Sequence, residues 1–153
     1  MKFKGFITIK ELNENPNLIP DVRGVYKVIF KGSKPSYLDE GTCGRFKDRE
    51  PNVSVKVLKE NWIEGADVVY IGKAGSPTGQ ATLRKRIKQY LKIGQGKKVG
   101  HWGGRFIWQL KDSDQLQFCW CETPNDDPSE IETDLIQEFR QEHGSRPFAN
   151  LTK

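Results

Sequence analysis

The sequence lacks the features that direct a chain into a membrane or out of the cell. No hydrophobic run approaches the roughly 20 apolar residues that a membrane-spanning helix requires. The first residues, MKFKGFITIKEL, carry charges among their apolar side chains, which excludes a secretory signal peptide. Only three cysteines are present, and their odd number and uneven spacing argue against a disulfide framework. These absences predict a cytoplasmic protein with no membrane partner.

Acidic residues are missing from one long stretch of the chain. Between Val68 and Lys111 there is no Asp or Glu, whereas ten Lys and Arg fall in that interval. The rest of the chain has fifteen basic and twenty acidic residues, so the net charge of +5 conceals a basic block on an acidic body. Such a block is typical of a protein that binds a polyanion, although a solvated basic helix would also explain it.

The length and the hydrophobic pattern predict one small mixed domain. At 153 residues, the chain can form a single domain, 1–153, with one core. Runs of β-branched and aromatic residues predict strands at 24–30, 67–72 and 116–122, with 3–9 as a further strand or edge segment. Helical spacing and stop signals predict helices at 54–62, 81–93 and 128–143. The fold class is therefore α/β (α+β), with a small three-stranded, mainly antiparallel sheet flanked by helices.

Two charged residues fall on helix faces that should be buried. At about 100° per residue, Arg86 lies beside Leu83, Ile87 and Tyr90. Glu132 projects into the apolar stripe of the last predicted helix. A buried charge is costly unless a partner compensates it. Periodicity leaves two interpretations open: the two residues form a buried ion pair, or Glu132 holds a divalent metal and Arg86 faces a phosphate.

The other motifs are weak when each is taken singly. Tyr26 and Tyr70 are typical core tyrosines of strands, and Lys73 follows a glycine at a strand end. The sequence has no Walker loop, no dinucleotide-binding glycine fingerprint and no nucleophile elbow. No organic cofactor is therefore expected.

Five short segments nevertheless occur in the order of one nuclease superfamily. They read GVY, VYIGKA, LRKRIKQYL, ETDLIQEF and FAN, at 24–26, 69–74, 83–91, 132–139 and 148–150. In these segments the chain resembles the GIY-YIG nuclease superfamily, most closely the N-terminal nuclease domain of the bacterial excision-repair endonuclease. The resemblance extends from about Ile19 to Asn150. It implies a GIY-YIG type fold and metal-dependent hydrolysis of DNA phosphodiester bonds.

The resemblance also implies a role for each matching residue. Tyr26 and Tyr70 are rival candidates for the general base that activates a water. Lys73 lowers a tyrosine pKa or contacts phosphate, and Arg86 binds the scissile phosphate. Glu132 holds one divalent ion, Mg²⁺ or Mn²⁺. Two more residues complete the implied catalytic set, Tyr90 and Asn150.

The basic residues outside this set are expected to contact DNA. The predicted backbone contacts are Lys85, Lys88, Lys92, Lys97, Lys98 and Arg105. His101, in the glycine-rich segment VGHWGGR, is a candidate for an extra phosphate or active-site contact.

The chain departs from the family in the spacing of its two tyrosines. Tyr26 and Tyr70 are 44 positions apart, where the family has a short hairpin. The insertion at about 31–66 is a candidate for substrate recognition or for a lid. Two alternatives to the nuclease stay open: a non-catalytic DNA-binding module of the same fold, and a basic interaction protein in which Arg86 and Glu132 merely pair.

Overall fold

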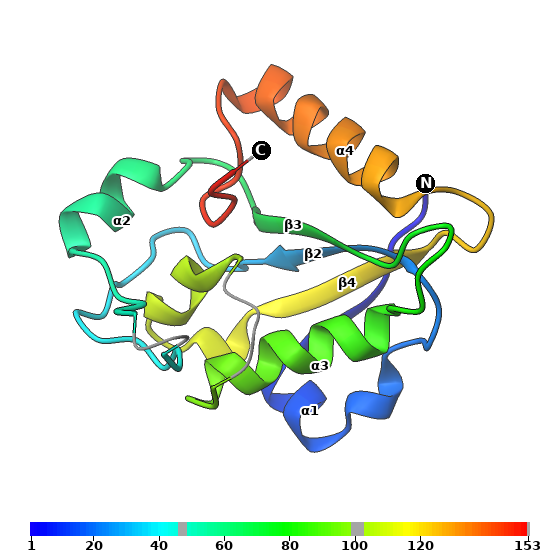
Figure 1. Ribbon diagram of the computed structural model, residues 1–153. Coiled ribbons are helices and arrows are strands. Elements are labelled where there is room, and N and C mark those ends of the chain that lie inside the picture. The colour runs from blue at the N-terminus through cyan, green and yellow to red at the C-terminus, as the bar shows by residue number, and fades with distance from the viewer. Residues whose placement is uncertain (46–48, 99–102, 153) are drawn as a thin grey trace.

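The computed structural model describes residues 1–45, 49–98 and 103–152 (Figure 1). Within these residues, four strands form one antiparallel sheet in the order β1-β4-β2-β3. The strands are β1 (Lys4–Thr8), β2 (Gly24–Ile29), β3 (Val68–Ala74) and β4 (Gln117–Glu122). The predicted mixed class and the antiparallel sheet are confirmed, but the prediction of three strands was wrong. The fourth strand is β1, which pairs with β4 at one edge of the sheet.

A break in the backbone of β1 explains why its pattern was ambiguous. Gly5 and Phe6 both have positive φ angles, +97° and +57°, and the pairing register shifts between Gly5 and Ile7. A bulge of this kind interrupts the alternation of inward and outward side chains. A Cβ atom at Gly5 would lie 2.9 Å from the Trp120 ring, so glycine also fits the close approach of the two strands.

The two long helices lie on opposite faces of the sheet (Figure 1). Helix α3 (Leu83–Gly94) begins after Thr82, whose hydroxyl accepts the Lys85 N–H, and helix α4 (Pro128–His143) begins after Asp127. A capping box joins the N-cap residue to the residue three positions later. Because Asp127 is the N-cap of α4, Glu132 lies too far along the helix to take part in one. The shorter helices are α1 (Ile9–Glu14), α2 (Val55–Asn61) and the 3-10 turns η1 (Pro16–Leu18), η2 (Arg105–Gln109) and η3 (Ser113–Gln115).

The main core fills the space between the sheet and α3. Its central side chains include Tyr26, Leu83, Ile87, Tyr90 and Phe118, all at most 1% exposed. A smaller cluster lies under α4 and is formed by Ile71, Ile136 and Phe139. In the part of the chain that the structure describes, no helix is long and apolar enough to cross a membrane.

The insertion at 31–66 packs against the body of the protein. Its backbone is bonded to η2 and to the last turn of α3: Leu38 N–H donates to the Gln109 carbonyl at 2.8 Å, and Gly44 N–H donates to the Ile93 carbonyl at 2.8 Å. The insertion also contains α2, which confirms the helix predicted at 54–62 and begins after the N-cap Ser54. These bonds tie the insertion to the helix that carries Arg86 and to the turn that carries Arg105.

Candidate active site

The first two site residues come together because β2 and β3 pair directly. Tyr26 lies opposite Gly72 in the register of the two strands. A Cβ atom at Gly72 would lie 2.4 Å from the Tyr26 ring, so the ring passes over the glycine. This brings Tyr26 to Tyr70, with 6.1 Å between ring centroids, and each of the two hydroxyls shifts the pKa of the other. Residues 44 positions apart in the chain thus form a contact pair.

Both tyrosine hydroxyls are influenced by the charges of Arg86 and Glu132. Burial raises the pKa of Tyr26 well above its usual value, and burial also raises the pKa of Tyr70 to about 12. The Glu132 carboxylate raises both pKa values further, whereas the Arg86 guanidinium lowers both. The Glu132 carboxylate on α4 and the Arg86 guanidinium on α3 therefore both influence the same tyrosine pair.

Two cavities are lined by the candidate site residues, and one of them reaches the tyrosine pair. The first has a volume of about 260 Å³ and is lined by Tyr70, Glu132, Asn150 and Arg105, together with residues of the 103–104 and 151–152 segments. The second has a volume of about 340 Å³ and is lined by Lys73 and Arg86, with the 74–81 loop forming the rest of its wall. Tyr26 is 1% exposed and lines neither cavity. Tyr70 is therefore the tyrosine that a substrate in the first cavity would meet.

Arg86 and Glu132 do not form the ion pair that one interpretation of the sequence predicts. Among the described residues, the Arg86 side chain forms neither a hydrogen bond nor an ion pair, although it is half-buried. Glu132 is 8% exposed, and in the described part of the chain no salt bridge joins its carboxylate to Arg86. A half-buried guanidinium beside a cavity is suited to bind an anion from outside the protein.

Tyr90 lies behind the site and supports it. Its side chain is completely buried, and its hydroxyl donates a hydrogen bond to the Gly104 carbonyl. Its ring packs edge-on against Tyr70, with 5.5 Å between centroids. A Cβ atom at Gly104, where φ is +73°, would meet the Tyr90 hydroxyl and the Tyr70 ring. The structure thus gives Tyr90 a place under the wall of the first cavity rather than on its surface.

Asn150 closes the outer edge of β3 with its side-chain amide. The Oδ1 atom accepts the Ile71 N–H at 2.9 Å, and the Nδ2 atom donates to the Ile71 carbonyl at 2.9 Å. One residue earlier, Ala149 N–H donates to the Val69 carbonyl at 2.8 Å. The C-terminal segment (red in Figure 1) therefore replaces a neighbouring strand beside Tyr70.

Removal of the Asn150 amide is expected to destabilise the protein. Asn150→Ala would leave the Ile71 N–H and carbonyl without partners at a buried position, which costs about 2–4 kcal/mol of unfolding free energy. Chemical denaturation measures the loss, and Asn125→Ala, in an exposed loop, serves as the matched control with a change of at most about 0.5 kcal/mol. Equal unfolding free energies for Asn150→Ala and wild type would contradict this role.

The predicted DNA-backbone lysines lie on more than one side of α3. Lys88 and Lys92 are roughly 200° and roughly 240° around the helix from Arg86. With Lys97 they line a groove between α3 and α1, away from Arg86. Lys85 and Lys98 are exposed. His101 lies outside the described residues.

Arg105 is located differently from the sequence-based prediction. Sequence grouped it with the outer lysines, whereas the structure places it in the wall of the cavity that contains Glu132. Sequence reasoning also missed Gln109, which is 1% exposed although it is polar. The paired glycines of HWGGR indicate a turn before Arg105, but they do not indicate which part of the fold the turn approaches.

Glu132 offers one carboxylate ligand for a metal. In residues 1–45, 49–98 and 103–152, no group of three or more His, Cys, Asp or Glu side chains could hold an ion. Mg²⁺ usually keeps several waters and takes one or two carboxylates together with substrate phosphates. Glu132 at the wall of a 260 Å³ cavity leaves room for such partners.

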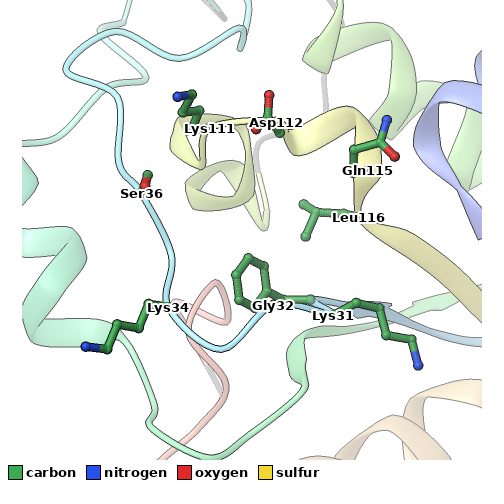
Figure 2. Close-up of a pocket in the computed structure, with 9 residues that line it drawn as sticks. Lys31, Gly32, Lys34, Ser36, Lys111, Asp112, Gln115 and Leu116 are labelled. Carbon is green, nitrogen blue, oxygen red and sulfur yellow. The ribbon is translucent and has the colours of Figure 1, made fainter.

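Another cavity, of about 270 Å³, lies between the start of the insertion and η3 (Figure 2). Lys31, Lys34 and Lys111 stand at its rim, but Figure 2 shows their side chains pointing away from its centre. None of the predicted site residues that the structure describes lines it. Its lysines therefore do not converge on one ligand.

Comparison with known proteins gives no family assignment. The chain matches no family model, and neither a curated protein nor a solved structure is significantly similar to it. The case for function therefore depends on the geometry of the site.

Proposed function

We propose that the protein is a metal-dependent endonuclease of the GIY-YIG type that hydrolyses phosphodiester bonds in DNA. One observation carries the proposal. Arg86 and Glu132 act on the same pair of tyrosine hydroxyls without pairing with each other. Opposite charges held apart beside a tyrosine are suited to a phosphate, a metal ion and a water that must lose a proton.

Tyr70 is the better general base of the two tyrosines. The Tyr26 hydroxyl lowers the pKa of Tyr70, whereas the Tyr70 hydroxyl raises that of Tyr26. Tyr70 also lines the cavity, whereas Tyr26 lies behind it. In this mechanism Tyr70 accepts a proton from the attacking water, and Tyr26 stabilises its charge.

The remaining charged residues bind and stabilise the substrate. Arg86 binds the scissile phosphate and stabilises the charge that develops on its oxygens, and Lys73 lines the same cavity. When bound at Glu132, Mg²⁺ or Mn²⁺ would offset the carboxylate charge and polarise a phosphoryl oxygen as a Lewis acid. Asn150 and Tyr90 act as supports: Asn150 holds β3, and Tyr90 holds the Gly104 segment.

DNA is the proposed substrate because the basic block supplies a cationic residue to each cavity of the site. The acid-free stretch from Val68 to Lys111 supplies Arg86 from α3 and Arg105 from η2. Lys88 and Lys92 of α3 line a separate groove, where they would bind phosphates farther along a DNA that wraps around the helix. Three free cysteines agree with a place of action in the reducing cytoplasm.

The principal alternative is a DNA-binding module of the same fold without activity. It would use the same basic surface but would not need Glu132 near the tyrosines. The interaction protein held together by an Arg86–Glu132 pair has less support, because that pair is not formed among the described residues.

A nicking assay distinguishes these functions. Purified protein is incubated with supercoiled plasmid and with branched DNA, in Mg²⁺, in Mn²⁺ or in EDTA. We expect nicking with either metal and none in EDTA. Binding of both DNAs with no cleavage under any of these conditions would contradict the nuclease and support the binding module.

A further inference from the structure

Arg105 is the second arginine beside the site, and it comes from a different element than Arg86. It lines the cavity of Tyr70, Glu132 and Asn150, whereas Arg86 lines the separate cavity of Lys73. The two guanidinium-bearing residues thus enter from η2 and from α3. A substrate that reaches both cavities would meet one arginine in each.

The position of Arg105 is set by the turn that precedes it. Gly104 has φ of +73°, a left-handed conformation that favours glycine, and it lies directly on the tyrosine stack. The Tyr90 hydroxyl donates a hydrogen bond to the Gly104 carbonyl. This turn therefore fixes where η2 begins and where Arg105 leaves the backbone.

The insertion is hydrogen-bonded to Gln109, the last residue of η2. The Gln109 side chain donates to the Leu38 carbonyl at 3.0 Å and to the Val53 carbonyl at 2.9 Å, and its Oε1 atom accepts the Val53 N–H at 2.9 Å. Gln109 is 1% exposed, so these bonds are shielded from water. The insertion thus stabilises η2, the five-residue 3-10 helix that begins with Arg105.

Arg105 is also prepared for an anion by its surroundings. Partial burial lowers the pKa of its guanidinium, because removal from water disfavours the charged form. Guanidinium groups are well matched to phosphate and are less strongly hydrated than ammonium groups.

We propose that Arg105 binds a phosphate next to the scissile phosphate on the same DNA strand, and that the insertion, through Gln109, positions it there. This inference rests on the proposed nuclease function. Arg86 and Arg105 then hold successive phosphates on either side of Tyr70. The insertion contributes to substrate binding by fixing a residue outside itself.

The test measures cleavage and binding in parallel. Cleavage of a labelled duplex gives kcat and KM, and fluorescence anisotropy in a Glu132→Gln background gives Kd at several salt concentrations. The variants are Arg105→Ala and Arg105→Lys, with Arg140→Ala as control, since Arg140 is an exposed arginine of α4 outside the site. Circular dichroism verifies that each variant is folded.

For Arg105→Ala we expect KM and Kd to rise by about tenfold while kcat stays within about threefold. The slope of log Kd against log salt should fall by about one, the loss expected for one phosphate contact. Arg105→Lys should keep most of the salt slope, and Arg140→Ala should match wild type. Unchanged KM, Kd and salt slope in Arg105→Ala, with an active wild type, would overturn the inference and leave the nuclease intact. An inactive wild type would instead refute the proposed function, and the binding data would still decide the role of Arg105.

The part played by the insertion is tested with Gln109→Glu. This change keeps the acceptor for Val53 N–H but loses the amide donor to Leu38 and Val53. We expect it to raise KM in wild type and to add little in the Arg105→Ala background. Equal effects on KM in both backgrounds would show that Gln109 acts on stability alone and would overturn the positioning role.

Discussion

Glu132→Gln is expected to reduce metal-dependent DNA nicking by about 10³-fold or more. Glutamine has nearly the same shape, but its amide is a poor ligand for Mg²⁺ compared with a carboxylate. Loss of the carboxylate charge would also remove one cause of the raised pKa of Tyr70. A lower pKa would increase the fraction of Tyr70 that is present as tyrosinate and can act as the base. We expect the loss of the metal ligand to dominate, because it removes the Lewis acid from the reaction. The measurement is the rate at which supercoiled plasmid becomes nicked at saturating Mg²⁺.

Glu138→Gln is the matched control for this change. Glu138 lies on the same helix, is exposed and lines neither cavity of the site, so its variant should cleave at the wild-type rate. Thermal unfolding of Glu132→Gln separates the two sequence-based interpretations. A structural ion pair would cost about 3–5 kcal/mol when broken, whereas a metal ligand should cost little in the absence of metal. A fully active Glu132→Gln would exclude Glu132 as the metal site.

Tyr70→Phe should reduce the nicking rate by about 10²–10⁴-fold, the range expected for removal of a general base. Tyr26→Phe should cost less, about tenfold, because it removes only the hydroxyl that lowers the pKa of Tyr70. Single-turnover rates at saturating enzyme would measure both losses without interference from product release.

The pH dependence of the rate identifies the base independently. With a Tyr70 pKa of about 12 in the free protein, the tyrosinate fraction is small at neutral pH and rises with pH. The wild-type rate should therefore increase by about tenfold per unit between about pH 6 and about pH 9, and Tyr70→Phe should lose most of this dependence. If Tyr26→Phe loses the dependence and Tyr70→Phe keeps it, Tyr26 is the base.

The main elements of the fold could be predicted because their signals are local. The strand that carries Tyr26 and the helix from Pro128 to His143 follow from β-branched runs, a proline near the helix start and a glycine stop, and the structure confirms both. Strand β1 was ambiguous because Gly5 and Phe6 have left-handed backbones that break the alternation. Residue propensities for strands do not predict such a left-handed backbone.

Without the resemblance, periodicity singled out a site residue only where a charge contradicted its own helix face. Arg86 and Glu132 were identified in this way, since a charge within an apolar stripe needs a partner. Arg105 and Gln109 gave no such signal, because both lie in a 3-10 turn that has no helical period to violate. Their positions depend on contacts with Tyr90 and with the insertion, which lie 14 or more residues away in the chain. Such contacts belong to tertiary structure and cannot be derived from local spacing.

The amide of Asn150 has a consequence for how the sheet meets other molecules. Strand β3 is an outer strand, and an uncovered outer strand is a template on which a second chain can add by backbone pairing. In this protein the segment from Pro147 to Asn150 occupies that template at Val69 and Ile71. These four residues thereby cover the outer edge of β3 at Val69 and Ile71, where a second chain could otherwise add by backbone pairing.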